Sequence, residues 1–181
     1  MIRVFSKLEL NDSRVLTEAE IRALISDPKP LVRDFVELRK QLQPAGFELT
    51  LRSVQTFRSA GSVDFSNEKR SQGNLENLEF EDDTLQLPAG AYVVRYNEVV
   101  ALPKDIMALI FPRSTLLRNG ATLYTAVWDP GYEGRGQGLL SVQNPHGLRL
   151  YANARIGQMI FFKLSKRVRK GYKGTYQHEG L

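Results

Sequence analysis

The 181-residue sequence lacks cysteine and contains only two histidines, His146 and His178. Without cysteine the chain has no disulfide, no thiolate metal site and no cysteine nucleophile, which fits a reducing cytosol. The two histidines lie far apart and neither has a partner at metal-ligand spacing, which argues against a zinc site. No apolar run approaches the length of a membrane span, and residues 1–7 lack the apolar core of a signal peptide. We therefore expect a cytoplasmic location and no membrane partner.

Apolar residues make up 42% of the chain, which is enough for one substantial core. The 25 basic residues exceed the 20 acidic ones by five, and much of the excess lies near the C-terminus. This excess is either a nucleic-acid patch or a solvated segment that attracts anionic small molecules. We favour the second, and expect no nucleic-acid partner, because the aromatic interleaving of single-strand-binding proteins is absent. The basic residues are Lys163, Lys166, Arg167, Arg169, Lys170 and Lys173.

The first 43 residues are predicted to form an N-terminal helical extension. Thr17 and Glu20 make a capping-box pattern, and apolar residues follow at helical spacing, which predicts a helix over about 18–26. Pro28 and Pro30 end that helix. A second helix is predicted from apolar residues spaced by four, three and four positions. These residues are Leu31, Phe35, Leu38 and Leu42.

After Gly46 the pattern changes to short strands separated by turn residues, which predicts an all-β sandwich or jelly roll over residues 44–170. The polar, acidic stretch 66–83 is expected to be a loop or an excursion at a sheet edge. A C-terminal arm over 171–181 completes the predicted organisation. The predicted strands cover residues 47–51, 92–100, 107–111, 139–142 and 158–164.

Residues 113–120 carry two arginines and two hydroxyls directly after a predicted strand. The Arg113 guanidinium can bind two phosphate oxygens at once, and a hydroxyl from Ser114 or Thr115 can donate to a third. The alternative is a surface turn with an ordinary salt bridge. The segment therefore indicates a phosphate site without establishing it.

A tight turn at residues 129–132 places a carboxylate near an aromatic ring, because proline and glycine follow Asp129 directly. Asp129 in such a position can orient a water molecule as a general base. The Tyr132 ring can pack against a sugar and disfavour an additional hydroxyl. The alternative is an aspartate that only starts a turn.

Two further segments are candidates for ligand binding. Arg155 and Gln158 stand at the start of an apolar strand, where a polar amide is costly unless it has a partner. Gln158 is therefore either an anion donor or an edge-strand polar residue. The glycine-punctuated C-terminal segment is either an arm that orders over a ligand or a frayed end. Its candidate binding residues are Tyr172, Lys173, Tyr176 and Gln177.

Taken in order, five segments resemble the motifs of the dUTPase and dCTP deaminase superfamily, and in particular its archaeal, deaminase-like dUTPase branch. Residues 43–49 resemble the first motif, which normally reads Ala-Gly-Tyr-Asp-Leu. Residues 113–116 match the second motif, usually Arg-Ser-Ser-Leu, and residues 127–134 match the third. Residues 155–158 match the fourth, and residues 172–177 resemble the deaminase-type fifth. The resemblance covers roughly residues 42–181.

This resemblance implies a distorted jelly-roll barrel that assembles as a homotrimer with active sites shared between subunits. It also implies a deoxynucleoside triphosphate bound with Mg²⁺, which prefers oxygen ligands and keeps several waters. Asp129 would orient the attacking water, Tyr132 would lie under the deoxyribose, and residues 123–128 would contact the pyrimidine. Glu48 stands at the aspartate position of the first motif and is a candidate to approach the metal through water. Arg113 and Ser114 would hold the phosphates, and Gln158 would contact the triphosphate from a neighbouring chain, with the C-terminal arm closing over the substrate. Further candidates for substrate binding are Thr115 and Arg155.

Both a diphosphatase and a deaminase use this scaffold. Family deaminases carry a proton-shuttling glutamate on the strand after the third motif, and the alternative countings place Ser141 or Leu139 there. Arg118 matches a deaminase arginine but is insufficient without that acid. We therefore predict hydrolysis of dUTP to dUMP and pyrophosphate. The alternatives are dCTP deamination, alone or combined with dUTP hydrolysis, and a non-catalytic nucleotide-binding module.

Two departures from the family pattern bear on the site. Glu48 is one methylene longer than the usual aspartate. The stretch that contains residues 135–138 is two residues longer than usual, and we expect a bulge there.

Overall fold

The computed structural model describes residues 13–181 and shows a mainly β protein, as predicted. The prediction about a signal peptide falls on residues 1–7, outside the described range. None of the helices in the described part has the length and apolar character needed to span a bilayer. The helices are α1 (Glu18–Ile25), α2 (Leu38–Gln41) and α3 (Ser114–Arg118). The strands are β1 (Arg14–Val15), β2 (Val32–Arg33), β3 (Leu42–Gln43), β4 (Gly46–Phe57), β5 (Leu75–Leu78), β6 (Thr84–Leu87), β7 (Gly90–Tyr96), β8 (Val99–Ala101), β9 (Ile106–Pro112), β10 (Ala121–Tyr124), β11 (Glu133–Gly134), β12 (Gln137–Val142), β13 (Leu148–Tyr151) and β14 (Arg155–Lys163).

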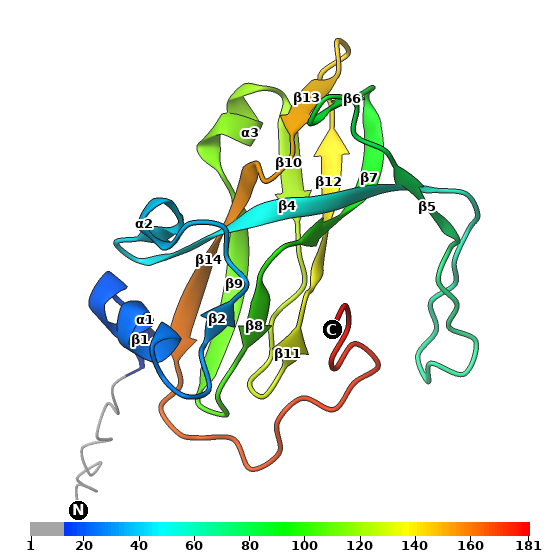
Figure 1. Cartoon of the computed structure of the whole chain (residues 1–181). Coiled ribbons are helices and arrows are strands. Elements are labelled where there is room, and N and C mark those ends of the chain that lie inside the picture. Colours follow the sequence, from blue (N-terminus) through cyan, green and yellow to red (C-terminus); the bar gives the residue numbers. More distant parts are fainter. Residues whose placement is uncertain (1–12) are drawn as a thin grey trace, which may run out of the picture.

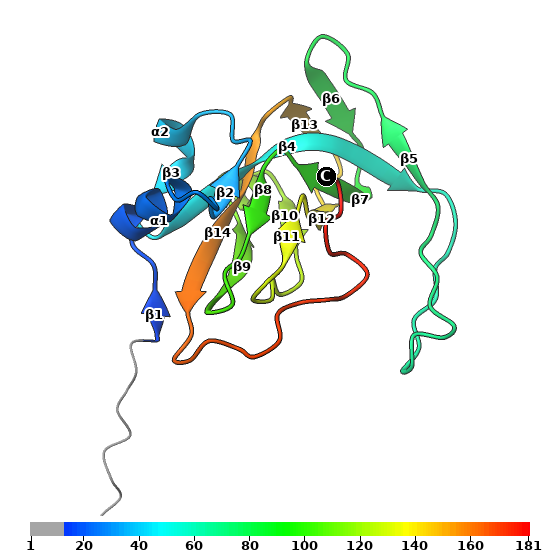
Figure 2. The ribbon, with the colours of Figure 1, turned by 60° about the horizontal axis from the view of Figure 1, so that its bottom comes forward.

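The largest sheet in the described chain has the strand order β1-β14-β4-β7-β12-β10, with β9 also paired to β14 and β3 and β5 to β4 (Figure 1). Strand β4 joins its two halves, because Phe47–Thr50 pair with β14 and Leu51–Thr56 pair with β7. Register shifts occur in both pairings, which is how a long strand bends from one set of neighbours to another. The sheet therefore curls around a single core, as Figure 2 shows from below.

Alternate residues of the long strands fill this core. Phe47, Leu49 and Leu51 of β4 are fully buried, as are Met159 and Phe161 of β14. This spacing of two follows the pleat of a strand, and the other face of β4 carries the buried polar residues Glu48 and Thr50. The predicted strands at 47–51, 107–111, 139–142 and 158–164 are confirmed, and the predicted strand at 92–100 is divided into β7 and β8.

The first predicted helix is confirmed as α1. The backbone N–H and hydroxyl of Thr17 both donate to the Glu20 carboxylate, at 3.0 and 2.8 Å. These bonds and a salt bridge from Arg14 lower the pKa of Glu20 to about 2. The capping pattern read from the sequence therefore fixes the start of this helix.

The second predicted helix is wrong. The segment that carries its apolar pattern instead contains the strand β2, a single helical turn (α2) and the strand β3. Asp34 interrupts it with a φ of 58°, which an α-helix does not allow. Strand β2 pairs with β8 and β3 pairs with β4, so tertiary pairing overrides the helical spacing. Within the described range, residues 13–43 are thus part of the same sheets and not a purely helical unit.

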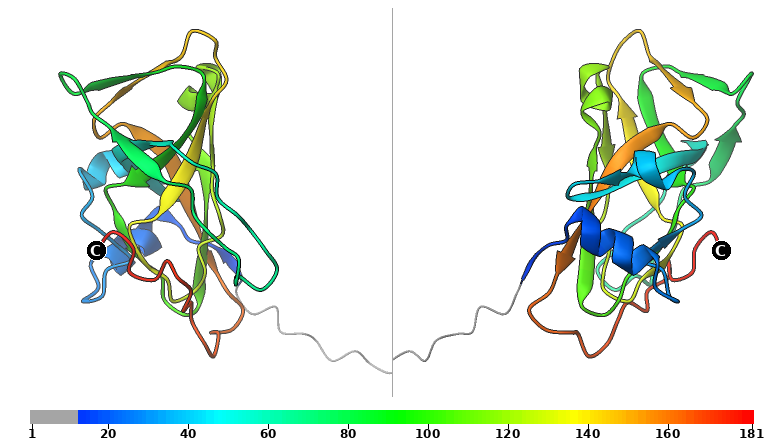
Figure 3. Two further views of the ribbon diagram at one scale, coloured as in Figure 1. Left: turned by 90° about the vertical axis from the view of Figure 1, so that its right-hand side faces the viewer. Right: turned by 60° about the vertical axis from the view of Figure 1, so that its left-hand side comes forward.

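Residues 58–74 form an excursion between β4 and β5 that stands away from the sheet, as the left view of Figure 3 shows. The predicted loop over 66–83 covers only part of this excursion and also contains strand β5, which pairs with β4. On the same side of the molecule, the C-terminal segment returns from the end of β14 toward β11 (Figure 1).

Candidate active site

Three of the sequence motifs meet where β14 lies between β4 and β9. Gln158 of β14 is opposite Glu48 of β4 on one side and Phe111 of β9 on the other. Strand β9 ends at Pro112, and the backbone N–H of Arg113 still donates to the Ile156 carbonyl at 3.1 Å. The sheet register therefore brings the first, second and fourth motifs together in one chain.

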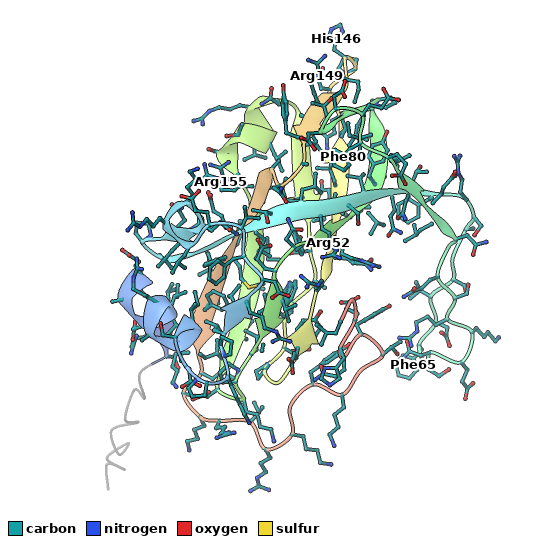
Figure 4. All side chains as sticks on the ribbon, viewed as in Figure 1. Arg52, Phe65, Phe80, His146, Arg149 and Arg155 are labelled. Atoms are coloured by element: carbon teal, nitrogen blue, oxygen red, sulfur yellow. The ribbon has the colours of Figure 1, made fainter. Side chains whose placement is uncertain are left out.

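Glu48 is the centre of this group. Its carboxylate accepts from Arg113 Nε at 2.6 Å through Oε1 and from Arg155 Nη1 at 2.8 Å through Oε2. The Glu48 side chain is only 7% exposed, whereas that of Arg113 is 27% exposed. The two guanidinium groups are thus fixed side by side with one negative charge between them, which leaves a net positive site. Figure 4 shows Arg155 where β14 passes the α2 segment, whose Lys40 carbonyl accepts a second bond from Arg155 at 2.8 Å.

This geometry bears on the predicted metal contact. Both carboxylate oxygens of Glu48 are bonded to arginines, and the predicted contact with a metal through water stays a prediction. Within residues 13–181 no group of three or more His, Asp or Glu side chains is arranged to hold a metal ion. The donor set therefore does not form a dedicated metal cage, and Glu48 acts in this structure as the anchor for two arginines.

The hydroxyls of the second motif lie next to these arginines. Ser114 and Thr115 are exposed at the start of α3, and Arg118 Nη1 donates to Ser114 Oγ at 3.2 Å. Gln158 is half-buried, and its amide lies so close to Gly46 that a Cβ there would be 3.1 Å from Gln158 Nε2. The first part of the site thus combines three arginines, two hydroxyls and one amide, the donors that an extended polyphosphate needs.

The third motif forms the predicted tight turn. Trp128 pairs with Ala108 of β9, and the Tyr132 N–H donates to the Asp129 carbonyl at 3.1 Å. Gly131 has a φ of 88°, as the third position of a type II turn requires. The Asp129 side chain is exposed and makes no hydrogen bond with residues 13–181. It is therefore open to a water molecule or a ligand.

Tyr132 is enclosed. Its ring is 6% exposed and packs edge-on against Trp128, with centroids 4.9 Å apart, and against Tyr172, at 5.7 Å. Its hydroxyl donates to Glu179 Oε1 at 2.9 Å. Burial, followed by the nearby Glu179 carboxylate, raises the pKa of Tyr132. A sugar does not reach the face of this ring in the present arrangement, so the predicted deoxyribose contact stays a prediction.

The C-terminal arm lies on the turn of the same chain. Tyr172 N–H donates to the Pro130 carbonyl at 2.8 Å, and Gln177 Nε2 donates to the Gly131 carbonyl at 3.1 Å. Gln177 Oε1 also accepts from the Glu133 N–H at 3.3 Å. The two other candidates on the arm, Lys173 and Tyr176, are exposed. The arm thus contacts the third motif directly, whereas the sequence left open whether it was a frayed end.

Beside the third motif a cavity of about 430 Å³ opens on the outer face of the sheet. Of the two positions considered from the sequence, Leu139 lines this cavity and Ser141 does not. The wall contains no carboxylate among the described residues. Its lining residues are Phe57, Val93, Tyr124, Thr125, Ala126, Gln137, Gly138 and Leu139.

The longer connection after the third motif packs tightly. A Cβ on Gly136 would lie 2.3 Å from the Trp128 ring, so only glycine fits against the indole. The Tyr96 N–H donates to the Gly136 carbonyl at 3.4 Å, and the Arg135 N–H donates to the Glu179 carbonyl at 2.8 Å. The added length therefore supports Trp128 and the arm.

The two groups of site residues lie apart within one chain. Ala108 of β9 pairs with Trp128, and Arg113 follows five residues later, about 17 Å further along an extended strand. Asp129 is therefore not brought to Arg113 by the fold of a single chain. The structure assembles the first, second and fourth motifs in one place and the third and fifth in another.

Sequence reasoning missed Glu179 and two residues of the cavity wall, Phe57 and Val93. Glu179 lies beyond the motif of residues 172–177, and Phe57 and Val93 belong to strands without a motif. Only the fold brings these residues to the site.

The chain matches the family model described as dCTP deaminase-like over residues 15–164. It is 50% identical over 167 residues to the probable deoxyuridine 5′-triphosphate nucleotidohydrolase of Archaeoglobus fulgidus, covering 92% of this chain and 98% of that protein. It is 46% identical over 166 residues to the protein of the same name from Methanosarcina mazei, covering 91% and 97%. The deoxyuridine 5′-triphosphate nucleotidohydrolase of Methanocaldococcus jannaschii is 39% identical over 140 residues, covering 76% and 88%.

Among solved structures, the 2′-deoxycytidine 5′-triphosphate deaminase from Agrobacterium tumefaciens superposes with a TM-score of 0.63 at 23% identity. The match covers 83% of this chain and 48% of that protein, so the chain spans about half of its length. This likeness shows that the two share a fold.

Proposed function

Because the chain belongs to the dCTP deaminase-like family, and its curated relatives are named deoxyuridine 5′-triphosphate nucleotidohydrolases, we propose that it hydrolyses dUTP to dUMP and pyrophosphate. The relatives match over nearly their whole length. A role in pyrimidine deoxynucleotide metabolism and a cytoplasmic location belong to the same proposal.

The observation that favours hydrolysis over deamination is the cavity beside the third motif. Deamination of cytosine needs a group that moves protons at the base, and a carboxylate is the family solution. The cavity carries Leu139 at this position, and no carboxylate among the described residues lines it. An apolar wall of this kind accommodates a pyrimidine ring but transfers no proton to it.

We assign the phosphate contacts to the cationic group around Glu48. Arg113, Ser114 and Gln158 are proposed to hold the triphosphate, with Thr115, Arg118 and Arg155 beside them. Fixed donors of this type stabilise charge that spreads over phosphoryl oxygens during transfer. The backbone and side chains of residues 124–126 are proposed to contact the base.

Asp129 is proposed to orient the attacking water. The water oxygen bonds to the α-phosphorus while the bond from that phosphorus to the bridging oxygen breaks, and pyrophosphate leaves with that oxygen. The proton of the water passes to the Asp129 carboxylate. Tyr132 remains the proposed deoxyribose contact, and since its ring is 6% exposed we expect the arm to move before the sugar reaches it.

Mg²⁺ is proposed to arrive with the nucleotide, bound by phosphate oxygens and water. This assignment follows from the donor set, since the Glu48 oxygens are bonded to arginines and residues 13–181 contain no cluster of three possible ligands. The metal would neutralise phosphate charge, and the chain would contribute the arginines and Asp129.

We further propose a homotrimer in which each active site is completed by a neighbouring copy. The position of Arg113, about 17 Å of extended strand beyond the residue that pairs with Trp128, supports this, because it sets Arg113 apart from Asp129 within one chain. Phe111, beside Gln158 on β9, is 53% exposed, which is consistent with a neighbouring surface there. The symmetric assembly of identical chains is the usual solution for such a surface.

The test is to incubate the purified protein and Mg²⁺ separately with dUTP and dCTP and to resolve the products by chromatography. We expect dUMP and pyrophosphate from dUTP and no reaction with dCTP. Formation of dUTP or dUMP from dCTP would instead establish the deaminase or the bifunctional alternative. Absence of reaction with both would favour a nucleotide-binding module or another nucleotide as substrate.

The Asp129→Asn variant tests the mechanism in the same assay. It keeps the size of the side chain but loses its basicity, so turnover should be abolished while dUTP binding, measured by calorimetry, is largely kept. Turnover at the wild-type rate would show that another group orients the water.

A further inference from the structure

Residues 58–74 form a hairpin-like excursion with an internally fixed shape. The Arg58 N–H donates to the Asn74 carbonyl at 2.8 Å, and Ser62 and Ser71 exchange backbone bonds at 3.0 and 3.1 Å. The hydroxyls of the same two serines lie 2.9 Å apart. The excursion is therefore closed at its base and again near its middle.

Two glycines allow its strands to approach closely. A Cβ on Gly73 would lie 2.4 Å from the Ser59 carbonyl oxygen, and one on Gly61 would lie 2.8 Å from that of Ser71. Any side chain at these positions would push the two strands apart. The sequence thus builds a defined protrusion whose outer residues have fixed positions.

This excursion contacts the C-terminal arm. Arg70 Nη2 donates to Thr175 Oγ1 at 2.7 Å, and Gln72 Nε2 donates to the Tyr176 hydroxyl at 2.9 Å. The paired residues are 105 and 104 positions apart in sequence. Figure 4 shows the excursion, marked by Phe65, on the side of the molecule where the C-terminal segment runs.

The arm is therefore held at two places. One is the turn of the third motif, which bonds Tyr172 and Gln177. The other is the excursion, which bonds Thr175 and Tyr176 between those two residues. A segment whose middle is already fixed has less conformational entropy. Its two ends therefore lose less entropy when they dock on the third-motif turn.

We propose that the excursion over residues 58–74 is a clamp for the C-terminal arm, and that Arg70 and Gln72 are positioning residues that keep the arm on the third-motif turn. The positioning itself is a property of the chain, whereas its effect on catalysis rests on the proposed dUTP hydrolysis. Loss of the clamp leaves the site residues intact and lowers the fraction of molecules whose arm is docked.

Hydrogen–deuterium exchange of the intact protein without nucleotide tests the clamp directly. In wild type the N–H groups of Tyr172 and His178 are bonded to Pro130 and Glu133 carbonyls and should exchange slowly. Gln72→Ala should speed exchange in the peptide 171–181 by about two- to fivefold, the factor expected for one exposed hydrogen bond. Glu68→Ala is the matched control, because Glu68 lies on the same excursion and its backbone N–H, which alanine keeps, bonds locally to Ser66.

Tyr176→Phe removes the partner hydroxyl and keeps the ring, so it should reproduce the effect of Gln72→Ala. The double variant should exchange no faster than either single variant, because both remove the same bond. Equal exchange of the arm in wild type and in both single variants would overturn the clamp. Exchange in the strands of the sheet and the melting temperature should be unchanged, which separates positioning from global stability.

The catalytic consequence is read from dUTP kinetics. Gln72→Ala should lower KM about two- to fivefold with a smaller change in kcat, because the docked arm covers Tyr132 and has to move before the sugar reaches it. Faster arm exchange with unchanged KM would overturn the positioning role in catalysis. If no form of the protein hydrolyses dUTP, the proposed function fails, and the exchange result still decides the clamp.

Discussion

At the residue scale, Glu48 determines how the positive group of the site is arranged. One buried carboxylate bonds two guanidinium groups through separate oxygens. The bond to each arginine fixes its direction, and the remaining donors of Arg113 are partly exposed. A longer side chain than the usual aspartate of the motif is thus compatible with a well-defined phosphate site, although the sequence suggested a metal role for it.

Replacing this carboxylate should damage stability and binding together. We expect Glu48→Gln to lower the free energy of unfolding by about 2 kcal/mol, because two partly buried arginines lose their shared anion. We expect Glu48→Asp to lose less, since the carboxylate remains and only its reach changes. Urea denaturation measures the effect, and an equal loss for both variants would show that the charge is not the cause.

Glu98 makes the free energy of unfolding depend on pH. Its side chain is fully buried and accepts from Gln41 Nε2 at 2.6 Å and from the Thr50 N–H at 2.9 Å. Burial raises the pKa of Glu98 above its ordinary value of 4.5, against the hydrogen bonds that lower it. Since the folded state holds this proton more tightly, the stabilising contribution is full below pH 4.5 and is lost as pH rises through the folded pKa.

The stability of wild type relative to Glu98→Gln should therefore fall as the pH rises above 4.5. Chemical denaturation of both proteins at several pH values measures the difference, which cancels the contributions of the other titrating groups. A difference that stays constant above pH 4.5, or grows with pH, would contradict the assignment.

At the scale of elements, the sequence predicts those whose determinants are local. The capping pair Thr17 and Glu20 marks the start of α1, and alternation marks β4, β9 and β14. The predicted second helix is wrong because its apolar residues belong to β2, α2 and β3. Strand β2 pairs with β8, which is distant in sequence, and β3 pairs with β4, which follows it directly. Short strands of two residues such as β1, β2 and β11 carry no periodicity of their own, so only tertiary pairing defines them.

The connection between β11 and β12 provides a test at this scale. Gly136→Ala should destabilise the protein by about 1–3 kcal/mol, because the new Cβ would overlap the Trp128 ring. Gly90→Ala is the control, since Gly90 is exposed and its Cβ would meet only the Tyr92 side chain, at 3.2 Å. Thermal unfolding of the two variants distinguishes them, and equal melting temperatures would mean that the indole moves aside.

At the scale of the whole molecule, the order of the motifs predicts the set of site residues but not their grouping. Residues from the first, second and fourth motifs meet because β14 pairs with both β4 and β9. The third and fifth motifs meet because the arm returns to the turn at Pro130. The separation between these groups depends on which residue of β9 each group lies beside. A local sequence pattern does not predict that position.

The measurement that tests the shared site most directly is complementation between two inactive variants. Asp129→Asn removes the proposed base and Gln158→Ala removes a proposed phosphate contact in the other group. The two chains, carrying different tags, are co-expressed, and the mixed oligomers are isolated by sequential affinity purification. Hydrolysis of dUTP is then compared with that of each variant alone.

If each site takes Asp129 from one copy and Gln158 from another, every mixed trimer has one site with both residues intact, and activity should return to about a third of the wild-type value. If every site is built within one chain, each site of the mixed oligomer retains one of the two substitutions. Activity no greater than the average of the separate variants would therefore contradict the shared site.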